Sequence, residues 1–449
     1  MMREKSEKCF VDINKFNELS ENILQQAKKN GATEAEVVIS LNKGFTVSAH
    51  DGDVEKVEYQ QDKSIAINVM FGKRSGSAGI SDIRPEAIKQ AVEAACHIAK
   101  FTDEDPASGL AEKEDLAFDY PHIEMNYPWK ISVDEAIEMA CQCEKEALAY
   151  DKRIMSAEET SVSTMEAFYL YANSHGFTGS FPHTRHEISC VLVGKEKDEM
   201  QRNYSYTTAA DPELLENISH VAKEAAERTV KHLGARKIKT MKTPVIYHAE
   251  EARGLFGHLI AAISGGNLYR KSSFLLDHLD EKILPSFMNL QELPHLDREL
   301  GSCPFDDDGI ATRNNIFIEG GVLRNYCLSV YTARKLGMKS TANAGGVHNL
   351  FVKSGNKDLS ELLKTMNKGL LITEIMGNGV NIVTGDYSRG VGGFWVENGE
   401  IQYPVQEITV AGKLQDMYAG IQEVGNDIDV RGNIRTGSVL INEMMVAGE

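Results

Sequence analysis

The sequence contains no hydrophobic stretch that approaches the ~20 apolar residues needed to cross a bilayer. Its N-terminal residues, MMREKSEKCFVDINK, also contain no apolar segment of the kind found in a secretion signal. The seven cysteines are scattered along the chain, and their odd number gives no disulfide framework. We therefore expect neither a membrane-spanning helix nor a disulfide-stapled secreted domain, and we predict a reducing, cytoplasmic location.

Basic residues are also scarce, since 48 Lys and Arg face 66 Asp and Glu and leave a formal charge of −18. Nucleic-acid binding needs clustered basic side chains, so we predict no nucleic-acid partner. The chain has no low-complexity segment. Its 42% hydrophobic and 25% charged residues, spread over 449 positions, are typical of a globular protein with two or three domains.

The first hundred residues combine helical and strand patterns. A stripe of apolar side chains predicts a helix over 14–30, and period-two alternation predicts short strands near 37–41, 45–47 and 65–69. Turns are predicted at Gly44, Asp51-Gly52 and Gly72. A second helix is expected to begin at Pro85, with Ile98 on its buried face. We predict an N-terminal α/β unit over residues 1–105.

Residues 106–238 are expected to form a middle α+β domain. Acids and prolines over 101–128 predict an exposed linker, and Ser132 with Glu135 forms a capping-box pattern that begins a helix. Two strands follow near 156–172 and 177–205, and a helix is predicted to start at Asp211-Pro212. His183 and His186 fall on the second strand and point to opposite faces, which predicts a solvated strand and no metal site.

Residues 239–449 are expected to form a C-terminal domain rich in mixed or antiparallel sheet. The segments 318–323 and 396–401 resemble each other weakly, and each predicts a β-hairpin around Gly-Gly or Asn-Gly. The overall fold class is therefore α+β.

Candidate chemistry is concentrated between Pro244 and His348. A strand-like run is followed by Glu250, Glu251 and an amphipathic helix that carries His258. A helical zinc hydrolase needs two histidines one turn apart with an adjacent glutamate, and His248 and His258 do not have that spacing. From the residues alone, His258 is more simply an ordinary histidine on a helix surface.

Two glycine-rich segments, 345–346 and 384–393, imply a close approach of the backbone to a ligand or to another strand. They match neither a phosphate-binding loop nor a serine-nucleophile motif. The acidic run 306–309 lacks the alternate spacing of a calcium loop and predicts a turn. Four side chains remain candidates for lining a substrate cleft: His258, His348, Asp386 and Arg389.

Several longer motifs make the C-terminal half distinctive. They are GLFGHL (254–259), GG-x-x-YRKSSFLLD (265–277), PHLDRELGSCPFDDDG (294–309), SVYTARKLGMKST (329–341), AGGVHN (344–349), TGDYSRG (384–390), GFWVENGEIQYPV (393–405) and VGNDI (424–428). In these motifs the chain resembles the TldD/PmbA metalloprotease family, specifically its PmbA (TldE) branch.

The resemblance implies a cytoplasmic subunit of a bacterial peptide-processing complex. In that family a TldD-like subunit is a zinc metalloprotease with an H-E-x-x-x-H motif and a cysteine as third ligand. PmbA-like subunits pair with it, and the pair is associated with the maturation of a modified peptide antibiotic and with antitoxin degradation. An older description of the family is modulator of DNA gyrase.

The resemblance also places the zinc motif on this sequence. The two histidine positions fall on Glu250 and Leu255, the general-base position falls on Glu251, and the cysteine position falls at or next to Thr436. Leucine cannot ligate zinc, and a catalytic zinc needs three protein ligands and an open position. We therefore expect no zinc in this chain and zinc in its partner, with Glu251 as the only residue kept at a catalytic position.

Three hypotheses follow. The leading one is a metal-less PmbA-type subunit that pairs with a TldD-like protease subunit, acts on peptide or unfolded protein substrates, and forms homodimers when alone. The second is a non-proteolytic binding protein that modulates gyrase or an antitoxin. The third is an independent hydrolase that uses His248, His258 or His348.

Overall fold

The computed structural model describes residues 10–448, and in its N-terminal half one six-stranded antiparallel sheet runs in the order β3-β2-β1-β4-β5-β6. Its strands are β1 (Glu34–His50), β2 (Asp53–Phe71), β3 (Arg74–Ile80), β4 (Ile154–Asn173), β5 (Thr178–Glu196) and β6 (Glu199–Ala209). The central strand β1 pairs with β2 on one side and with β4 on the other. Residues on both sides of position 105 therefore contribute to a single sheet.

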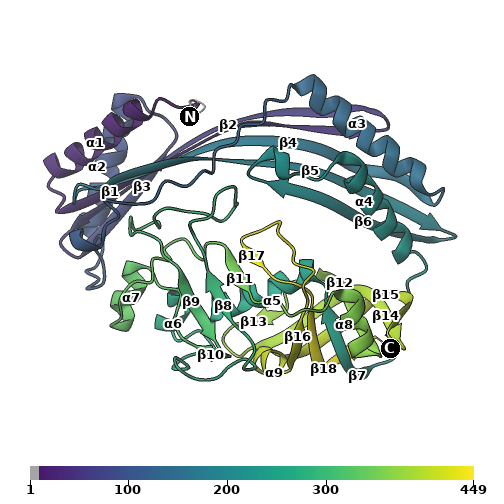
Figure 1. The fold of residues 1–449 in the computed structure, drawn as a ribbon. Helices are drawn as coiled ribbons and strands as arrows, with labels where there is room; N and C mark the ends of the chain where they lie inside the picture. The colour runs from purple at the N-terminus through teal and green to yellow at the C-terminus, as the bar shows by residue number, and fades with distance from the viewer. Residues whose placement is uncertain (1–9, 449) are drawn as a thin grey trace, which may run out of the picture.

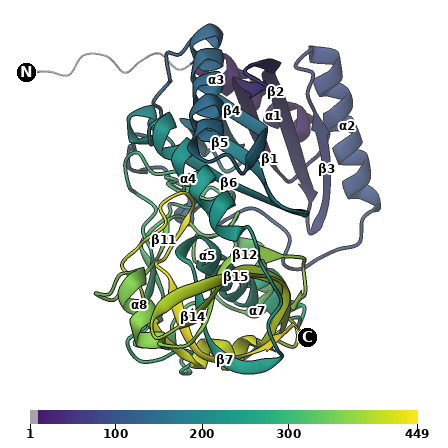
Figure 2. The ribbon, with the colours of Figure 1, turned by 90° about the vertical axis from the view of Figure 1, so that its right-hand side faces the viewer.

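Two pairs of helices cover one face of this sheet (Figure 1). They are α1 (Ile13–Lys29) with α2 (Pro85–Phe101), and α3 (Val133–Tyr150) with α4 (Ile218–His232). On β1, Ile39 packs with the first pair and Val47 with the second. These two residues are an even number of positions apart, so their side chains lie on the same face of the strand. The other face arches over the C-terminal domain (Figures 1 and 2).

The C-terminal domain contains a seven-stranded sheet in which β12, β7, β18, β15 and β14 close into a ring, because β12 also pairs with β14. The only parallel pair in this sheet, over the part of the chain that the structure describes, is β7 with β12. The strands are β7 (Met241–Tyr247), β12 (Gly369–Met376), β13 (Val380–Asn381), β14 (Asp386–Glu397), β15 (Glu400–Lys413), β16 (Ile421–Val424) and β18 (Val439–Ala447).

A smaller five-stranded sheet lies beside the ring, in the order β10-β9-β8-β11-β17. Its strands are β8 (Leu290–Glu292), β9 (Asn315–Glu319), β10 (Val322–Leu323), β11 (Leu350–Val352) and β17 (Ile434–Arg435). The helices of this domain are α5 (Ala249–Ala262), α6 (Gly265–Tyr269), α7 (Val330–Leu336), α8 (Leu359–Met366) and α9 (Leu414–Ala419). Helix α5 contacts β7 and β12 of the larger sheet and β17 of the smaller one.

A hydrophobic core with an aromatic centre joins the two halves of the molecule. Phe305 of the C-terminal domain packs against Tyr169, Phe177 and Phe181 of the sheet, with ring centroids 5.3–6.3 Å apart. Burial of such rings is a large source of stability. It fixes the C-terminal domain under the sheet.

The α+β class is confirmed, and so are several locally encoded elements. Helices α1 and α2 begin within one residue of the predicted positions, and the Ser132–Glu135 capping box opens α3. The Gly320-Gly321 and Asn398-Gly399 turns join β9 to β10 and β14 to β15. The two similar hairpins belong to different sheets.

Two predicted element boundaries are wrong, a turn and a helix start. Gly44 lies inside β1 rather than at a turn, and a Cβ there would lie 2.0 Å from the Thr164 carbonyl oxygen of β4. This glycine therefore serves close strand approach. The helix predicted at Asp211-Pro212 is only a short 3-10 turn, Pro212–Leu214, and α4 starts afresh after Asn217, whose side chain accepts from the His220 amide.

Three burial predictions are also wrong. After the end of α2 at Phe101, the segment up to 128 contains only one 3-10 turn (Lys113–Asp115), as a linker would, but Leu110, Leu116 and Ile123 are buried. Leu116 packs in one cluster with Tyr171 of the sheet and Phe305 of the C-terminal domain. His186 is fully buried, where its ring nitrogens contact the Thr164 hydroxyl and the Tyr127 carbonyl, so its strand is not solvated. Ile98 is 48% exposed.

Within residues 10–448, no helix is both long and apolar enough to cross a membrane.

Candidate functional site

The first turn of α5 lies where the two halves of the molecule meet. Strand β7 ends at Tyr247, and His248 caps the helix without a side-chain hydrogen bond. The Ala249 amide instead donates to the Ser438 hydroxyl over 3.0 Å, and that hydroxyl donates to Asp427 over 2.6 Å. Ser438 and Asp427 belong to the segment 425–438 between β16 and β18, called the C-terminal loop here. Because this loop satisfies a free amide of the helix, it sets where α5 begins.

Glu250 is held between two arginines. Its carboxylate lies 2.9 Å from Arg228 of α4 and 2.9 Å from Arg431 of the C-terminal loop, and the side chain is only 7% exposed. Burial alone would raise the pKa of Glu250, but Arg228 and Arg431 outweigh it and hold this pKa below its usual value. Glu250 is therefore ionised and fully engaged in ion pairs.

The arginines are themselves fixed by further contacts. Arg431 makes two hydrogen bonds to the Asp429 carboxylate, at 3.0 and 2.8 Å, and a third to the Tyr206 carbonyl at 3.2 Å. The Tyr206 hydroxyl accepts from Arg253 of α5. The result is a buried charge network, defined here as Arg228, Glu250, Arg253, Asp429 and Arg431. It joins α4 and β6 of the N-terminal half to α5 and the C-terminal loop.

The donor set at the family's zinc positions does not fit zinc. Leu255 is 2% exposed and has no donor atom in its side chain, and Glu250 is occupied by two guanidinium groups. The Thr436 hydroxyl is fully buried and donates to the Gly437 carbonyl. Among residues 10–448, no three His, Cys, Asp or Glu side chains are grouped so as to hold a metal ion.

Glu251 faces a different environment from Glu250. Burial is the main cause that raises the pKa of Glu251 to about 7, and the neighbouring carboxylates of Glu250 and Glu374 add to it. A carboxyl group with such a pKa can give or take a proton near neutral pH. The chemical capacity of a general base is therefore present without metal ligands around it.

The structure brings three of the predicted site residues together. Burial raises the pKa of Glu251 and lowers that of His258; the Arg389 charge offsets a small part of the first change and adds to the second. The His258 ring packs edge-on against Tyr387, with centroids 6.1 Å apart. Tyr387 and Arg389 are two positions apart on β14 and share a face, which turns Arg389 towards α5.

Asp386 and His348 lie elsewhere. Asp386 is exposed at the start of β14, on the opposite face from Arg389, and pairs with Lys413 over 2.7 Å. Strand alternation alone separates these two residues. His348 lies just before β11 and contacts Glu292 of the smaller sheet.

Sequence reasoning did not single out Arg228, Arg431, Tyr204 or Tyr206. The Tyr204 hydroxyl contacts Glu250 at 3.4 Å, and the Tyr206 carbonyl accepts from Arg431. The two tyrosines are two positions apart on edge strand β6 and so lie on the same face. That spacing is the only feature of the local sequence that could have indicated a shared role. Nothing in the sequence near Arg228 or Arg431 indicates that they share a carboxylate.

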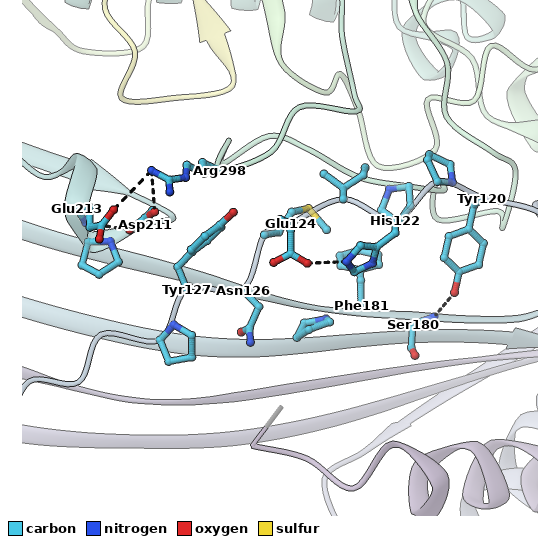
Figure 3. A pocket seen from close by; sticks show the side chains of 17 residues that line it. Tyr120, His122, Glu124, Asn126, Tyr127, Ser180, Phe181, Asp211, Glu213 and Arg298 are labelled. Carbon is cyan, nitrogen blue, oxygen red and sulfur yellow. Dashed lines mark hydrogen bonds and ion pairs between the residues drawn. The ribbon is translucent and has the colours of Figure 1, made fainter. Parts of the chain in front are cut away.

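A separate pocket of about 470 Å³ lies between the sheet and the C-terminal domain (Figure 3). Segment 120–128 lines it together with Phe181 of the sheet and Arg298 of the C-terminal domain. Arg298 pairs with Asp211 at 3.2 Å, and the rings of Tyr120, Tyr127 and Phe181 contribute apolar surface to a mixed lining. It contains none of the predicted site residues.

The chain is similar to known proteins along almost its whole length. Family models described as PmbA/TldA metallopeptidase domain 1, central domain and C-terminal domain match residues 35–99, 126–233 and 240–448. Metalloprotease PmbA of Escherichia coli O157:H7 is 46% identical over 95% of this chain and 94% of its own length. A PmbA homologue of Haemophilus influenzae is 45% identical over the same shares of the two chains.

Among solved structures, a proposed modulator of DNA gyrase from Bacteroides thetaiotaomicron superposes with a TM-score of 0.92 at 27% identity. The match covers 97% of this chain and 99% of the other. The three family models together match most of the chain, and a relative that is 46% identical covers 95% of it, so the family is established. The chain belongs to the PmbA/TldA metallopeptidase family, in its PmbA (TldE) branch.

Proposed function

We propose that this chain is the non-catalytic subunit of a heteromeric TldD–PmbA zinc metalloprotease that processes peptides and unfolded proteins, including antitoxins. The observation that carries the proposal is the state of Glu250. At a zinc-ligand position it makes two buried ion pairs, with Arg228 and Arg431, that already neutralise its charge. Together with Leu255, this leaves no ligand set for zinc at the positions that the family uses, and in this proposal zinc is supplied by the TldD-like partner.

The role of the chain is then to complete a shared chamber and to position an extended substrate. Peptide addition to a sheet edge is one way to hold such a substrate, and β6 is an edge strand beside the charge network. The carbonyls of Tyr204 and Tyr206 on that edge, however, accept from Arg228 and Arg431. We therefore place substrate contact along Glu251, His258 and Arg389 rather than on this part of β6.

The experiment is reconstitution with a TldD-like H-E-x-x-x-H subunit and an assay of unfolded-peptide cleavage. Without the partner we expect no cleavage. With it, Glu251→Gln in this chain leaves kcat within about 2-fold and alters only KM, as expected for a substrate contact, whereas loss of the partner's own general base lowers kcat about 100-fold or more. Glu374→Gln, a second carboxylate near Glu251, is the matched control. Cleavage by this chain alone, abolished by Glu251→Gln, would overturn the proposal.

Metal content separates the proposal from the independent-hydrolase alternative. We expect zinc in the reconstituted complex and none at stoichiometric level in this chain purified by itself. Stoichiometric zinc in the isolated chain, lost on changing His248, His258 or His348, would support the alternative.

A second candidate function rests on the description of the Bacteroides structure as a proposed modulator of DNA gyrase. In that case the chain acts by protein contact without proteolysis, since its net charge of −18 opposes DNA binding. Stable association with gyrase or an antitoxin in a pull-down without a TldD-like partner would favour this candidate. Association that requires the partner would favour the protease complex.

A further inference from the structure

The first part of strand β2 has an unpaired backbone edge. Strand β1 pairs with β2 along its whole length, but β3 pairs with the other side of β2 only from Ile65 to Phe71. Over residues 10–448, no strand pairs with that side between Asp53 and Ser64. The N–H and C=O groups that point outward from such an edge can pair with an extended segment of another chain.

The side chains along this edge are exposed as well. Between positions 53 and 63, only Val57 and Lys63 are half-buried, and all the other residues are exposed. Tyr59 is 74% exposed, although it lies opposite Phe45 of β1 with ring centroids 6.4 Å apart. Tyrosine is one of the residues that most often anchor protein–protein interfaces, so this edge has both free backbone groups and an anchor.

The charges along the edge are complementary to those of a second, antiparallel copy. Charged side chains usually prevent an edge strand from pairing with another chain. When Tyr59 of one copy lies opposite Tyr59 of the other, however, Glu55 lies opposite Lys63 of the second copy. Lys56 lies opposite Asp62 in the same way. Both ion pairs occur twice about the two-fold axis, and no like charges face each other.

The neighbouring two-fold registers lack this complementarity. An axis through Glu58 would place the two Glu58 carboxylates opposite each other, and an axis through Gln60 would place Glu58 opposite Asp62. Like charges directly opposite each other on paired strands are destabilising. The charges therefore favour the register centred on Tyr59.

We propose that a second copy of this chain pairs antiparallel with residues 54–64 of β2, in the register that places Tyr59 opposite Tyr59. The two six-stranded sheets then form one continuous sheet across the dimer. A single pair of strands buries little surface, so we expect a concentration-dependent dimer rather than an obligate one. The edge belongs to the arched sheet, whereas Glu251 lies in the domain beneath it (Figure 1). The dimer therefore needs neither zinc nor a TldD-like partner.

Sedimentation velocity of the full-length chain by itself, over a series of concentrations, measures the dimer. Lys56→Glu turns an ion pair into a like-charge pair and should raise the dimer Kd at least ~10-fold, and Asp62→Lys should do the same. The double variant that carries both changes restores opposite charges and should dimerise like the unmodified protein. Lys339→Glu makes the same charge change at an exposed position of the C-terminal domain and is the matched control.

Cysteine cross-linking tests the register. Residues directly opposite each other on antiparallel strands have Cα atoms about 4.5–5.5 Å apart, which a disulfide can bridge. Tyr59→Cys should therefore give a disulfide-linked dimer on mild oxidation. Glu55→Cys should not, because at about 3.4 Å per residue the two copies of position 55 lie ~27 Å apart. The unmodified protein, oxidised in the same way, gives the background from the native cysteines.

Three results would overturn the proposal. They are a chain that stays monomeric at every concentration, a dimer that Lys56→Glu leaves unchanged, and a Tyr59→Cys variant that does not cross-link above background. If Lys56→Glu instead prevents binding of a TldD-like subunit, the edge belongs to that interface and not to a second copy. Should a charge variant fail to fold, cross-linking of Tyr59→Cys decides. Peptide cleavage by the reconstituted complex is measured separately, so failure of the dimer is distinguishable from failure of the proposed function.

Discussion

Glu250 and Glu251 are adjacent carboxylates on one helical turn, yet the structure gives them opposite properties. Arginines hold the pKa of Glu250 below its usual value, whereas burial raises the pKa of Glu251 to about 7. A buried charge is tolerated only where it is paired. The partners of each residue, and not its position on α5, decide its charge.

Replacing Glu250 should therefore lower the free energy of unfolding. Glu250→Ala leaves Arg228 and Arg431 without their shared carboxylate in a largely buried site, and the loss of one partner of a buried pair costs about 3–5 kcal/mol of unfolding free energy. Glu250→Gln keeps one hydrogen-bond acceptor and the size of the side chain, so it should lose less. Urea unfolding measures both, with Glu251→Ala as the neighbouring control. Equal stability of Glu250→Ala and the unmodified protein would contradict the account of the network.

Glu251 should make stability depend on pH. Its pKa is raised from 4.5 to about 7 by folding, so the folded state favours the protonated form. Stability is then lost as the pH rises from about 4.5 to about 7, by up to about 3 kcal/mol for a shift of this size. Glu251→Gln removes that loss, so its stability relative to the unmodified protein should grow across this window and level off above it. Urea unfolding at a series of pH values measures the difference, and two parallel curves would refute the prediction.

The sequence could identify this glutamate pair but not its environment. The zinc-motif resemblance placed Glu250, Glu251 and Leu255 on α5, where the structure has them. The two arginines lie 22 and 181 residues from Glu250 in the chain. No local spacing encodes contacts of that range, because they depend on how α4 and the C-terminal loop fold onto α5.

At the scale of elements, α7 fastens the C-terminal domain to segment 105–112. Arg334 donates to the carbonyls of Gly109 and Leu110 over 2.8 and 2.7 Å, and pairs with Glu112 over 3.0 Å. Lys335 on the same helix pairs with Asp105 over 2.7 Å. These contacts account for the order of a segment that has the composition of a linker.

Arg334→Ala should loosen this attachment. It removes two charge-assisted hydrogen bonds to partly buried carbonyls, which are together worth about 2–3 kcal/mol. Arg84→Ala is a fitting control, because Arg84 is 82% exposed and its ion pair is with Asp82 next to its own helix. We expect lower urea stability and faster proteolysis within 105–112 for Arg334→Ala only. Equal proteolysis of the two variants would exclude a clamping role.

The elements that the sequence predicted correctly have local causes. The Ser132 capping box and the Asn398-Gly399 turn each act within four residues. The turn prediction at Gly44 is wrong because this glycine allows the close approach of β4, which lies more than a hundred residues away in the chain. The exposure prediction for 101–128 is wrong because the composition of this segment does not reveal the surface that buries it. A glycine in a strand and a glycine in a turn have the same sequence signature.

At the scale of the whole molecule, the long sheet is the frame on which the rest is assembled. Strand β1 pairs with β4 from Glu36 to Ala49, and this pairing joins β1–β3 to β4–β6. Each half of the sheet therefore needs the other to complete its backbone hydrogen bonds. The composition shift at 101–128 suggested a boundary between two units, but pairing across such a distance has no local signal. The C-terminal domain differs, since its main core is made of residues from Ile238 onwards.

This arrangement predicts how the chain divides into fragments that fold alone. Residues 106–238 lack β1, which leaves β4 unpaired on one side and exposes Phe168, Leu170 and Ala172, whose packing partners lie in α1, α2, β1 and β2. We expect this fragment to be unfolded or aggregated.

Residues 1–238 keep the complete six-stranded sheet, and residues 239–449 keep the closed strand ring, so both should fold cooperatively. Each should be less stable than the intact chain, because the aromatic core around Phe305 and the Arg228–Glu250 pair are lost. Circular dichroism during thermal and urea unfolding measures this directly. A cooperative transition for 106–238 by itself would show that the sheet does not need β1, and would overturn the view of 1–238 as one folding unit.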